Sequence, residues 1–291
     1  MRPRDLFVLA TVGVGWLAGS PAAAQQHVVL RYRPELGQIA RTLTEVRTTT
    51  TLTGFPAAPD GATFEEQQRI SATVRVSGDS PDGAVVAVTI DSISRRSRMG
   101  TDPWVDRGDT LLVGRTAEAI VSPRFDIVGI RSRGPTDADV LQTLGAGVIG
   151  LGFTFPQSAV TVGESFETGG RVRTRVTTDA STGVAVDEVV FGDLALALDS
   201  VTVAGADTLS YFQFRGSVAP RSGAAAGETG DVVTSTSGGF AGRLVWSAQW
   251  GAFVSGAVRV RVQGRITTTG PGGAAQAQAT WDRLIVHSVR P

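Results

Sequence analysis

Side chains that could act as acids, bases or nucleophiles are few in this sequence of 291 residues. The chain has no cysteine and no lysine, which excludes thiol nucleophiles, thiolate metal sites and Schiff bases. Only His27 and His287 supply imidazole, and we expect them on the first and last strands, which could pair and bring them close. A metal site there would need further ligands, and the sequence indicates none. We therefore predict surface or strand-edge histidines, no metal site and no cofactor.

Three residues resemble a catalytic block. Gly78-Asp79-Ser80 is similar to the nucleophile segment of the GDS-type lipases, and Asp282 and His287 lie near the C-terminal end, where that family has its acid and base. The family's pair is separated by two residues, whereas four residues separate Asp282 from His287. Its fold is a parallel α/β sheet, but residues 77–84 are typical of a hairpin tip. We expect no catalytic site and keep an unrecognised hydrolase as the third hypothesis.

Arginine recurs at every second position in two segments, so that within each segment the guanidinium groups share one face of a strand. On neighbouring strands they could bind phosphate or carboxylate groups bidentately. The alternative is a solvated face on which the arginines meet acidic side chains of adjacent strands. The equal numbers of basic and acidic residues, 27 each, favour this alternative. The candidate anion-binding residues are Arg171, Arg173, Arg175, Arg259, Arg261 and Arg265.

An aromatic group is the other candidate site. Trp246, Trp250 and Phe253 lie close together in sequence, and Phe125 occupies the matching place of a similar segment. Trp246 should share the apolar face of a strand with Leu244. A large apolar concavity between curved sheets would suit a lipid or acyl chain. The alternative is ordinary core packing, in which aromatic rings dominate any β domain.

The elements that must position these residues are mostly strands. Apolar and polar residues alternate in Ile70–Val76, Val258–Ile266 and Ala279–Val289, which is typical of antiparallel sheets with one buried face. The last of these segments places Trp281, Arg283, Ile285 and His287 on one face. Asp82-Gly83 predicts a hairpin turn, and Ser217–Gly239, rich in small residues, predicts a long loop.

A repeated phrase suggests an internal duplication. Gly114–Arg133 and Gly242–Arg261 agree at five positions, 128 residues apart, and each should form a strand-turn-strand unit. Between the two halves, Thr136 could cap a short helix. We therefore predict an all-β, mainly antiparallel protein with curved sheets or half-barrels in two related lobes, residues 25–133 and 159–291. A helical bridge, residues 134–158, would join them.

The N-terminal segment predicts an exported protein. Arg2 and Arg4, a short apolar run and Ala22-Ala23-Ala24 form the pattern of a cleaved signal peptide over residues 1–24. Without cysteine there is no lipid anchor, so we expect a periplasmic or secreted location. The near-neutral charge argues against nucleic acid as a partner.

Three further segments carry a resemblance to known proteins. Arg33-Pro34-Glu35-Leu36-Gly37, Phe155-Pro156 and Val160–Phe166 are similar to segments of exported bacterial two-lobed β-proteins labelled only as domains of unknown function. A more distant similarity, of fold only, is to the half-barrels of periplasmic lipoprotein carriers. The resemblance implies a fold without an activity.

Three functional hypotheses remain, of which an unrecognised hydrolase is the third. The first is a non-catalytic envelope protein that binds a lipid or another apolar or amphipathic small molecule between its lobes. The second is a structural or assembly protein whose sheet edges bind an envelope protein. Alternation also permits an outer-membrane barrel, but the chain has only two tyrosines, so aromatic girdles are hard to build.

Overall fold

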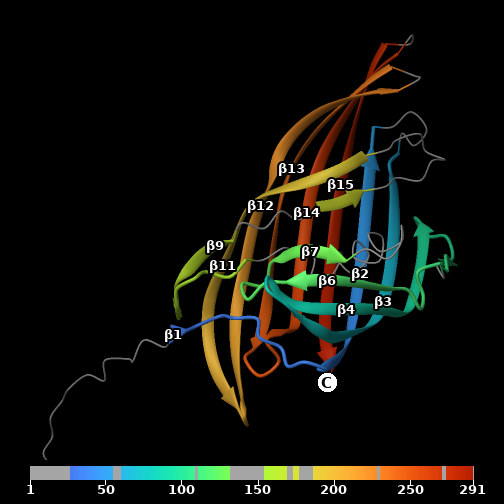
Figure 1. Cartoon of the computed structure of the whole chain (residues 1–291). Helices are drawn as coiled ribbons and strands as arrows, with labels where there is room; N and C mark the ends of the chain where they lie inside the picture. Colours follow the sequence, from blue (N-terminus) through green and yellow to red (C-terminus); the bar gives the residue numbers. More distant parts are fainter. Residues whose placement is uncertain are drawn as a thin grey trace, which may run out of the picture.

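The computed structural model describes residues 27–54, 60–108, 111–131, 154–168, 173–176, 186–227, 230–270 and 273–290. Every regular element among them is a β-strand, and every strand pairing is antiparallel (Figure 1). The all-β, antiparallel class is thereby confirmed. The expected signal peptide and the helix expected at Thr136 lie outside the described residues. The described end of the predicted bridge, residues 154–158, is not helical.

One sheet of 13 strands dominates the structure, in the order β10-β11-β12-β13-β14-β15-β2-β3-β4-β6-β7, with β5 beside β4 and β9 beside β11. A second sheet pairs only β1 with β8. The strands are β1 (His27–Val28), β2 (Ile39–Thr53), β3 (Ala62–Ser80), β4 (Gly83–Met99), β5 (Val105–Asp106), β6 (Thr116–Val121), β7 (Ile127–Arg131), β8 (Val160–Thr161), β9 (Ser165–Thr168), β10 (Arg173–Val176), β11 (Val186–Ala204), β12 (Asp207–Gly227), β13 (Gly230–Ser247), β14 (Ala252–Gly270) and β15 (Gly273–Arg290).

The two halves of the chain meet inside the large sheet. The last strand, β15, pairs with β2 from Arg290 opposite Arg41 to Gln278 opposite Thr53. Strands of the predicted first and second lobes therefore belong to one continuous sheet. Two separate lobes are not seen in the described residues, and the boundaries predicted for them stay a prediction.

Alternating side chains give the sheet two different faces. Ile70, Ala72 and Val76 of β3 are buried, as are Trp281 and Ile285 of β15, which confirms the faces expected from the sequence. Buried residues of β3, β4, β6 and β11 to β15 belong to one main core cluster, which includes Ala72 and Trp281, so the sheet must curve around it. In Figure 1, β6 and β7 accordingly cross in front of the long strands. We call this buried face the inner face and the opposite one the outer face.

The segment Ser217–Gly239 is not the loop that its composition suggested. Its described residues continue β12 and β13, whose backbones pair from Leu209 opposite Ser247 to Gly227 opposite Gly230. Small residues are poor strand formers by themselves, but hydrogen bonding to a neighbouring strand overrides that preference. The turn expected at Asp82-Gly83 is confirmed, because Ser80 pairs with Gly83 across it.

Candidate ligand-binding site

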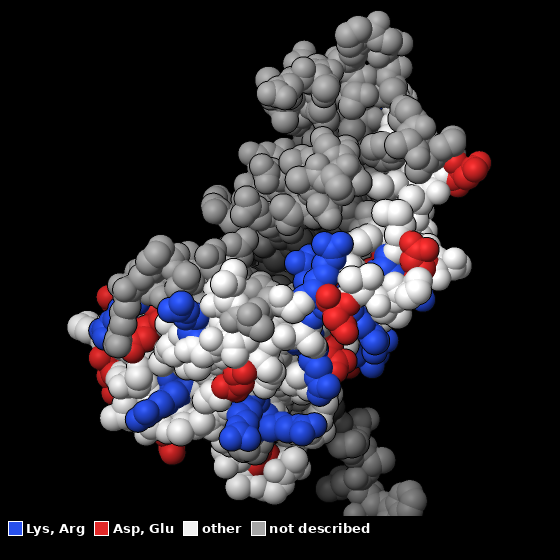
Figure 2. All heavy atoms as spheres, turned by 90° about the vertical axis from the view of Figure 1, so that its right-hand side faces the viewer, with Lys and Arg blue, Asp and Glu red and all other residues white. Residues whose placement is uncertain are grey.

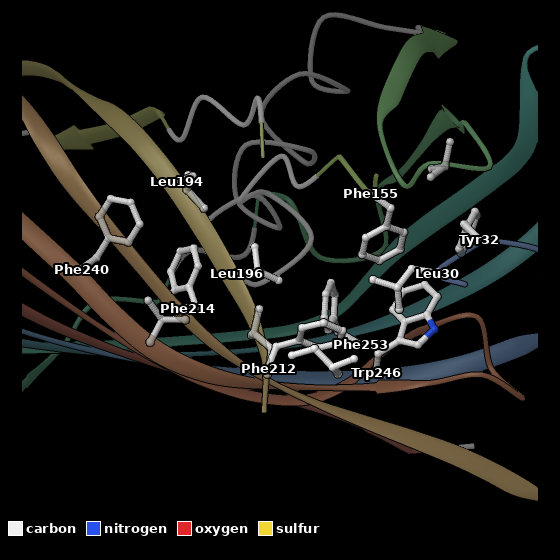
Figure 3. Packing of buried hydrophobic residues seen from close by; sticks show 14 of the residues in the cluster. Leu30, Tyr32, Phe155, Leu194, Leu196, Phe212, Phe214, Phe240, Trp246 and Phe253 are labelled. Atoms are coloured by element: carbon white, nitrogen blue, oxygen red, sulfur yellow. The ribbon is translucent and has the colours of Figure 1, made fainter. Parts of the chain in front are cut away.

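Five aromatic rings meet at one end of the curved sheet. We call Tyr32, Phe125, Phe155, Trp246 and Phe253 the aromatic cluster. The centroid of the Trp246 ring lies 4.7 Å from Phe155, 5.2 Å from Phe253 and 5.5 Å from Phe125, each in an edge-on arrangement. Such edge-on contacts are the favourable geometry for aromatic pairs. Figure 3 shows four of these rings grouped beside Leu30.

The cluster joins parts of the chain that are distant in sequence. Trp246 lies near the end of β13 and Phe253 near the start of β14, whereas Phe125 lies in the turn between β6 and β7. Phe125 and Phe155 are linked by their backbones as well, because the Phe155 N–H donates to the Arg124 carbonyl at 2.8 Å. The Arg124 guanidinium in turn donates from Nε to the Phe155 carbonyl at 2.8 Å. These contacts close one end of the inner face.

Three of the four residues that the sequence proposed for ligand binding come together in this cluster. Trp246 and Phe253 are 2% and 3% exposed, so their rings fill the core rather than line an open surface. Trp250 lies outside the cluster, in the turn between β13 and β14, and its N–H donates to Ser247 Oγ at 3.0 Å. Sequence reasoning missed Phe155 as a site residue, although Phe155-Pro156 was part of the resemblance. A role of these residues in ligand binding stays a prediction.

A polar group interrupts the apolar inner face at its middle. We call Thr48, Glu66, Arg95, Trp281 and Arg283 the inner polar cluster. The strand register places Arg283 opposite Thr48 and Trp281 opposite Thr50, and Thr48 in turn lies opposite Glu66. Arg283 Nε donates to Thr48 Oγ1 at 3.1 Å, and Arg95 Nη2 forms an ion pair with Glu66 Oε2 at 2.8 Å. Neighbouring strands β15, β2, β3 and β4 thus supply one polar patch.

Two groups in this patch are incompletely satisfied. Burial lowers the pKa of Arg283, with Glu66 opposing the shift and Arg95 adding to it. The indole Nε1 of Trp281 is buried and has no hydrogen-bond partner among the described residues. Buried donors are nearly always paired in proteins, so an orphaned one invites an explanation. The sequence placed Arg283 and Trp281 on one face but gave no sign of Glu66 and Arg95.

The two histidines do not meet. His287 Nδ1 lies 3.0 Å from Thr44 Oγ1 on the inner face, and burial lowers the pKa of His287 to about 4. His27 Nδ1 lies 3.0 Å from Thr161 Oγ1 across the β1–β8 pair. The expectation that the first and last strands pair is wrong, because β15 pairs with β2 and β14 instead. In the part of the chain that the structure describes, no group of three or more metal-ligating side chains exists.

The residues similar to the GDS-type block are not assembled into a triad. Asp282 is on the outer face, where its carboxylate binds Arg259, whereas His287 is buried on the inner face. Ser80 ends β3 ten residues beyond Ile70, which itself lies opposite Thr44. At about 3.4 Å per residue, the serine is roughly 34 Å along the strand from the histidine's neighbour.

The predicted arginine ladder is divided between distant strands. Arg259 and Arg261 on β14 both bind Asp282 of β15, at 2.7 Å and 3.2 Å from their Nε atoms, while Arg265 of β14 is exposed. Arg173 and Arg175 belong to β10, which β11, β12 and β13 separate from β14, and Arg171 is outside the described residues. The structure therefore does not bring the two halves of the ladder together. Asp282 provides the acidic partner that was expected if the arginines lie on a solvated face.

The outer face of β2, β3 and β4 has a shallow hollow of about 400 Å³. Arg47, Gln67 and Arg96 are among its lining residues. Arg96 and Arg98 both lie over the Trp104 ring, at 4.9 Å and 4.7 Å from its centroid. Figure 2 shows basic and acidic side chains intermingled on this side of the molecule.

Comparisons with known proteins give distant likenesses of fold. No family model and no curated protein matches the chain. A solved structure of lipovitellin, described by its lipid–protein interactions, is 9% identical with a TM-score of 0.47, covering 89% of this chain. Two porins, OpdQ of Pseudomonas aeruginosa and a BenF-like porin of Pseudomonas fluorescens, are 9% and 8% identical, with TM-scores of 0.19 and 0.17.

The matches cover different shares of these solved structures. The match covers 26% of the lipovitellin chain, but 100% and 99% of the two porins, and 88% and 87% of this chain. Among the described residues, no helix is long and apolar enough to span a membrane. Likenesses at this level carry no argument about what the protein binds.

Proposed function

We propose that this protein is an exported, non-catalytic protein of the bacterial envelope that binds an apolar or amphipathic ligand against the inner face of its curved sheet. One observation supports this proposal above the others. The inner face carries a large apolar core cluster with residues from both halves of the chain, yet it also holds the inner polar cluster, whose Trp281 donor has no partner among the described residues. A surface of this composition suits a molecule with an acyl chain and one polar end.

The apolar part of the inner face has the chemistry of a lipid site. Leu196 of β11, Phe212 of β12, Leu244 of β13 and Val258 of β14 are all buried there, each 1% exposed or less. Curved antiparallel sheets commonly bind apolar ligands on their concave side. In this proposal the aromatic cluster, with Phe125, Trp246 and Phe253, is the floor against which the end of an acyl chain rests.

A structural or assembly role is the second candidate, and one edge of the sheet favours it. Strand β7 is the last strand on its side of the sheet, and among the described residues no further strand pairs with it. Its Ile127, Val128 and Ile130 are 40%, 50% and 53% exposed. An open edge with apolar side chains can accept a strand from a partner chain.

Native mass spectrometry of the protein purified from its own envelope tests the two candidates directly. A lipid that co-purifies and leaves on gentle activation supports the first, whereas a stoichiometric protein partner supports the second. Replacing Ile130 by arginine provides the matched control, because it disrupts the β7 edge at an exposed position outside the core cluster. Loss of a bound lipid on Ile130→Arg contradicts the inner-face proposal. Apo protein without lipid or partner overturns both.

A further inference from the structure

Arg283 is an unusual residue for the inner face. It follows Trp281 on the buried side of β15 and precedes Ile285, both of which are apolar and no more than 7% exposed. A guanidinium group carries five N–H donors, and the only hydrogen bond that Arg283 makes within the described chain goes to Thr48. Burying a charge without a counterion is costly. The site therefore retains both charge and donors that the described residues do not use.

The local charge balance favours an incoming anion. The negative charge of Glu66 acts on Arg283, but Glu66 is already in an ion pair with Arg95. Thr48 separates Arg283 from Glu66 in the sheet, which puts the two backbones about 10 Å apart. Two guanidinium groups and one carboxylate leave the inner polar cluster with one uncompensated positive charge.

A second donor lies next to this charge. Trp281 is two residues before Arg283 on the same face of β15, at a Cα separation of about 7 Å. Trp281 is 7% exposed, and its Nε1 donor has no partner in the part of the chain that the structure describes. An oxyanion placed between the two side chains would accept a charge-assisted hydrogen bond from Arg283 and a second bond from the indole.

We infer that Arg283 and Trp281 together bind the anionic head group, a carboxylate or phosphate, of an amphipathic ligand. The inference rests on the proposed function and extends it from an apolar ligand to an acidic amphiphile. The acyl chain runs along the apolar part of the inner face. Neutral amphiphiles of equal chain length bind more weakly, because they leave the charge of Arg283 uncompensated.

Competition binding with the wild-type protein tests this inference without any mutation. A fluorescent acyl probe is displaced by dodecanoate, dodecyl phosphate and dodecan-1-ol, which share one chain and differ in head group. We expect the two anions to bind about 30-fold more tightly than the alcohol, as is typical for a desolvated charge pair. Equal affinities for all three compounds overturn the anionic-head-group inference and leave the proposed function intact. Absence of any acyl binding overturns both.

Inorganic phosphate distinguishes a head group from a free anion. Failure of phosphate to displace the acyl probe supports recognition of an amphiphile. Saturable binding of phosphate alone, together with no preference among the three dodecyl compounds, identifies a free-anion site and overturns the inference.

Three variants assign the effect to named side chains. Arg283→Met should abolish the preference for anions, and Trp281→Phe, which keeps the ring and removes the donor, should reduce it about tenfold. Arg47→Met is the matched control, since Arg47 precedes Thr48 on β2 and points to the outer face. It should leave the preference unchanged. Equal losses in Arg47→Met and Arg283→Met contradict the assignment, and if Arg283→Met does not fold, the Trp281→Phe result decides.

Discussion

At the scale of single residues, His287 makes stability depend on pH. Its folded-state pKa is about 4, below the ordinary value of 6.5, because the imidazole is buried. The unfolded chain therefore binds more protons than the folded chain between these values. We expect the free energy of unfolding to fall by about 3 kcal/mol as the pH is lowered from 7 to 4, with no further loss from this group below that. Denaturant unfolding at a series of pH values measures it.

The variant His287→Asn isolates this contribution. Asparagine offers Thr44 a hydrogen-bond partner and does not titrate. Carboxylates such as Asp282, whose pKa is lowered by its hydrogen bond to Arg259, also lose stability in acid, but they do so equally in both proteins. The stability of the wild type relative to the variant should therefore fall by about 3 kcal/mol between pH 6.5 and 4, and a constant difference would contradict the assignment.

At Phe125 the backbone conformation is unfavourable, whereas the packing of the side chain is favourable. Its φ of 65° lies in the left-handed region, which is strained for a residue with a Cβ, yet its ring packs against Tyr32, Phe155, Trp246 and Phe253. Phe125→Ala loses the packing and keeps the strain, and it should cost about 3 kcal/mol. Phe125→Gly loses the same packing but relieves the strain.

Glycine should therefore be the less harmful replacement at this position, by up to about 1 kcal/mol, which reverses the usual order in which alanine is preferred. Thermal or chemical unfolding of the two variants measures the difference. A glycine variant less stable than the alanine variant would show that the turn is not held in this conformation.

At the scale of elements, the two copies of the repeated segment form similar hairpins, but their matching residues have different structural roles. Both copies are strand-turn-strand units, β6–β7 and β13–β14, as the sequence predicted. Gly114 lies in a turn with a φ of 77° and nothing near its missing Cβ, whereas a Cβ on Gly242 would lie 2.3 Å from the Ala257 carbonyl oxygen. Phe125 and Phe253 contact each other at 5.6 Å instead of occupying equivalent places in two lobes. An internal duplication is not shown.

Replacing either glycine by alanine should therefore lower the stability of the protein, but for different reasons. Gly242→Ala forces the backbone of β14 away from β13, and we expect a loss of about 1–3 kcal/mol. Gly114→Ala strains only a turn and should cost about 1 kcal/mol. Gly108→Ala is the control, because its Cβ would meet nothing within 4 Å and its φ is not positive. Chemical denaturation ranks the three, and a Gly242→Ala variant as stable as Gly108→Ala would refute the close approach.

The sequence predicted which face of a strand each side chain occupies better than it predicted which strands lie side by side. Alternation places Trp281, Arg283 and His287 on one side of β15, because the side-chain period of a strand is fixed. Which strand lies beside which depends on long-range pairing, and no local pattern encodes that β15 meets β2. For this reason the inner polar cluster, built from four strands, could not be predicted, and the arginine ladder was placed on strands that are not adjacent.

At the scale of the whole molecule, the continuous sheet predicts that the two halves of the chain unfold cooperatively. Two independent lobes would unfold separately, whereas strands of both halves share the β15–β2 pairing and one core cluster that includes Ala72 and Leu244. Breaking either half exposes the buried face of the other, so intermediates should be disfavoured. We expect one unfolding transition for the chain.

Two probes in different halves test this expectation. Trp104 lies between β4 and β5, and Trp246 lies at the end of β13, so single-tryptophan variants report on the two halves separately. With phenylalanine at the remaining tryptophan positions, both probes should give the same denaturant midpoint, coincident with the loss of strand signal in circular dichroism. Single-tryptophan variants that share one circular dichroism midpoint serve as the control for unequal destabilisation. Under that control, two separate fluorescence midpoints would restore the two-lobed description, since a shared sheet cannot lose one half while the other keeps its buried face.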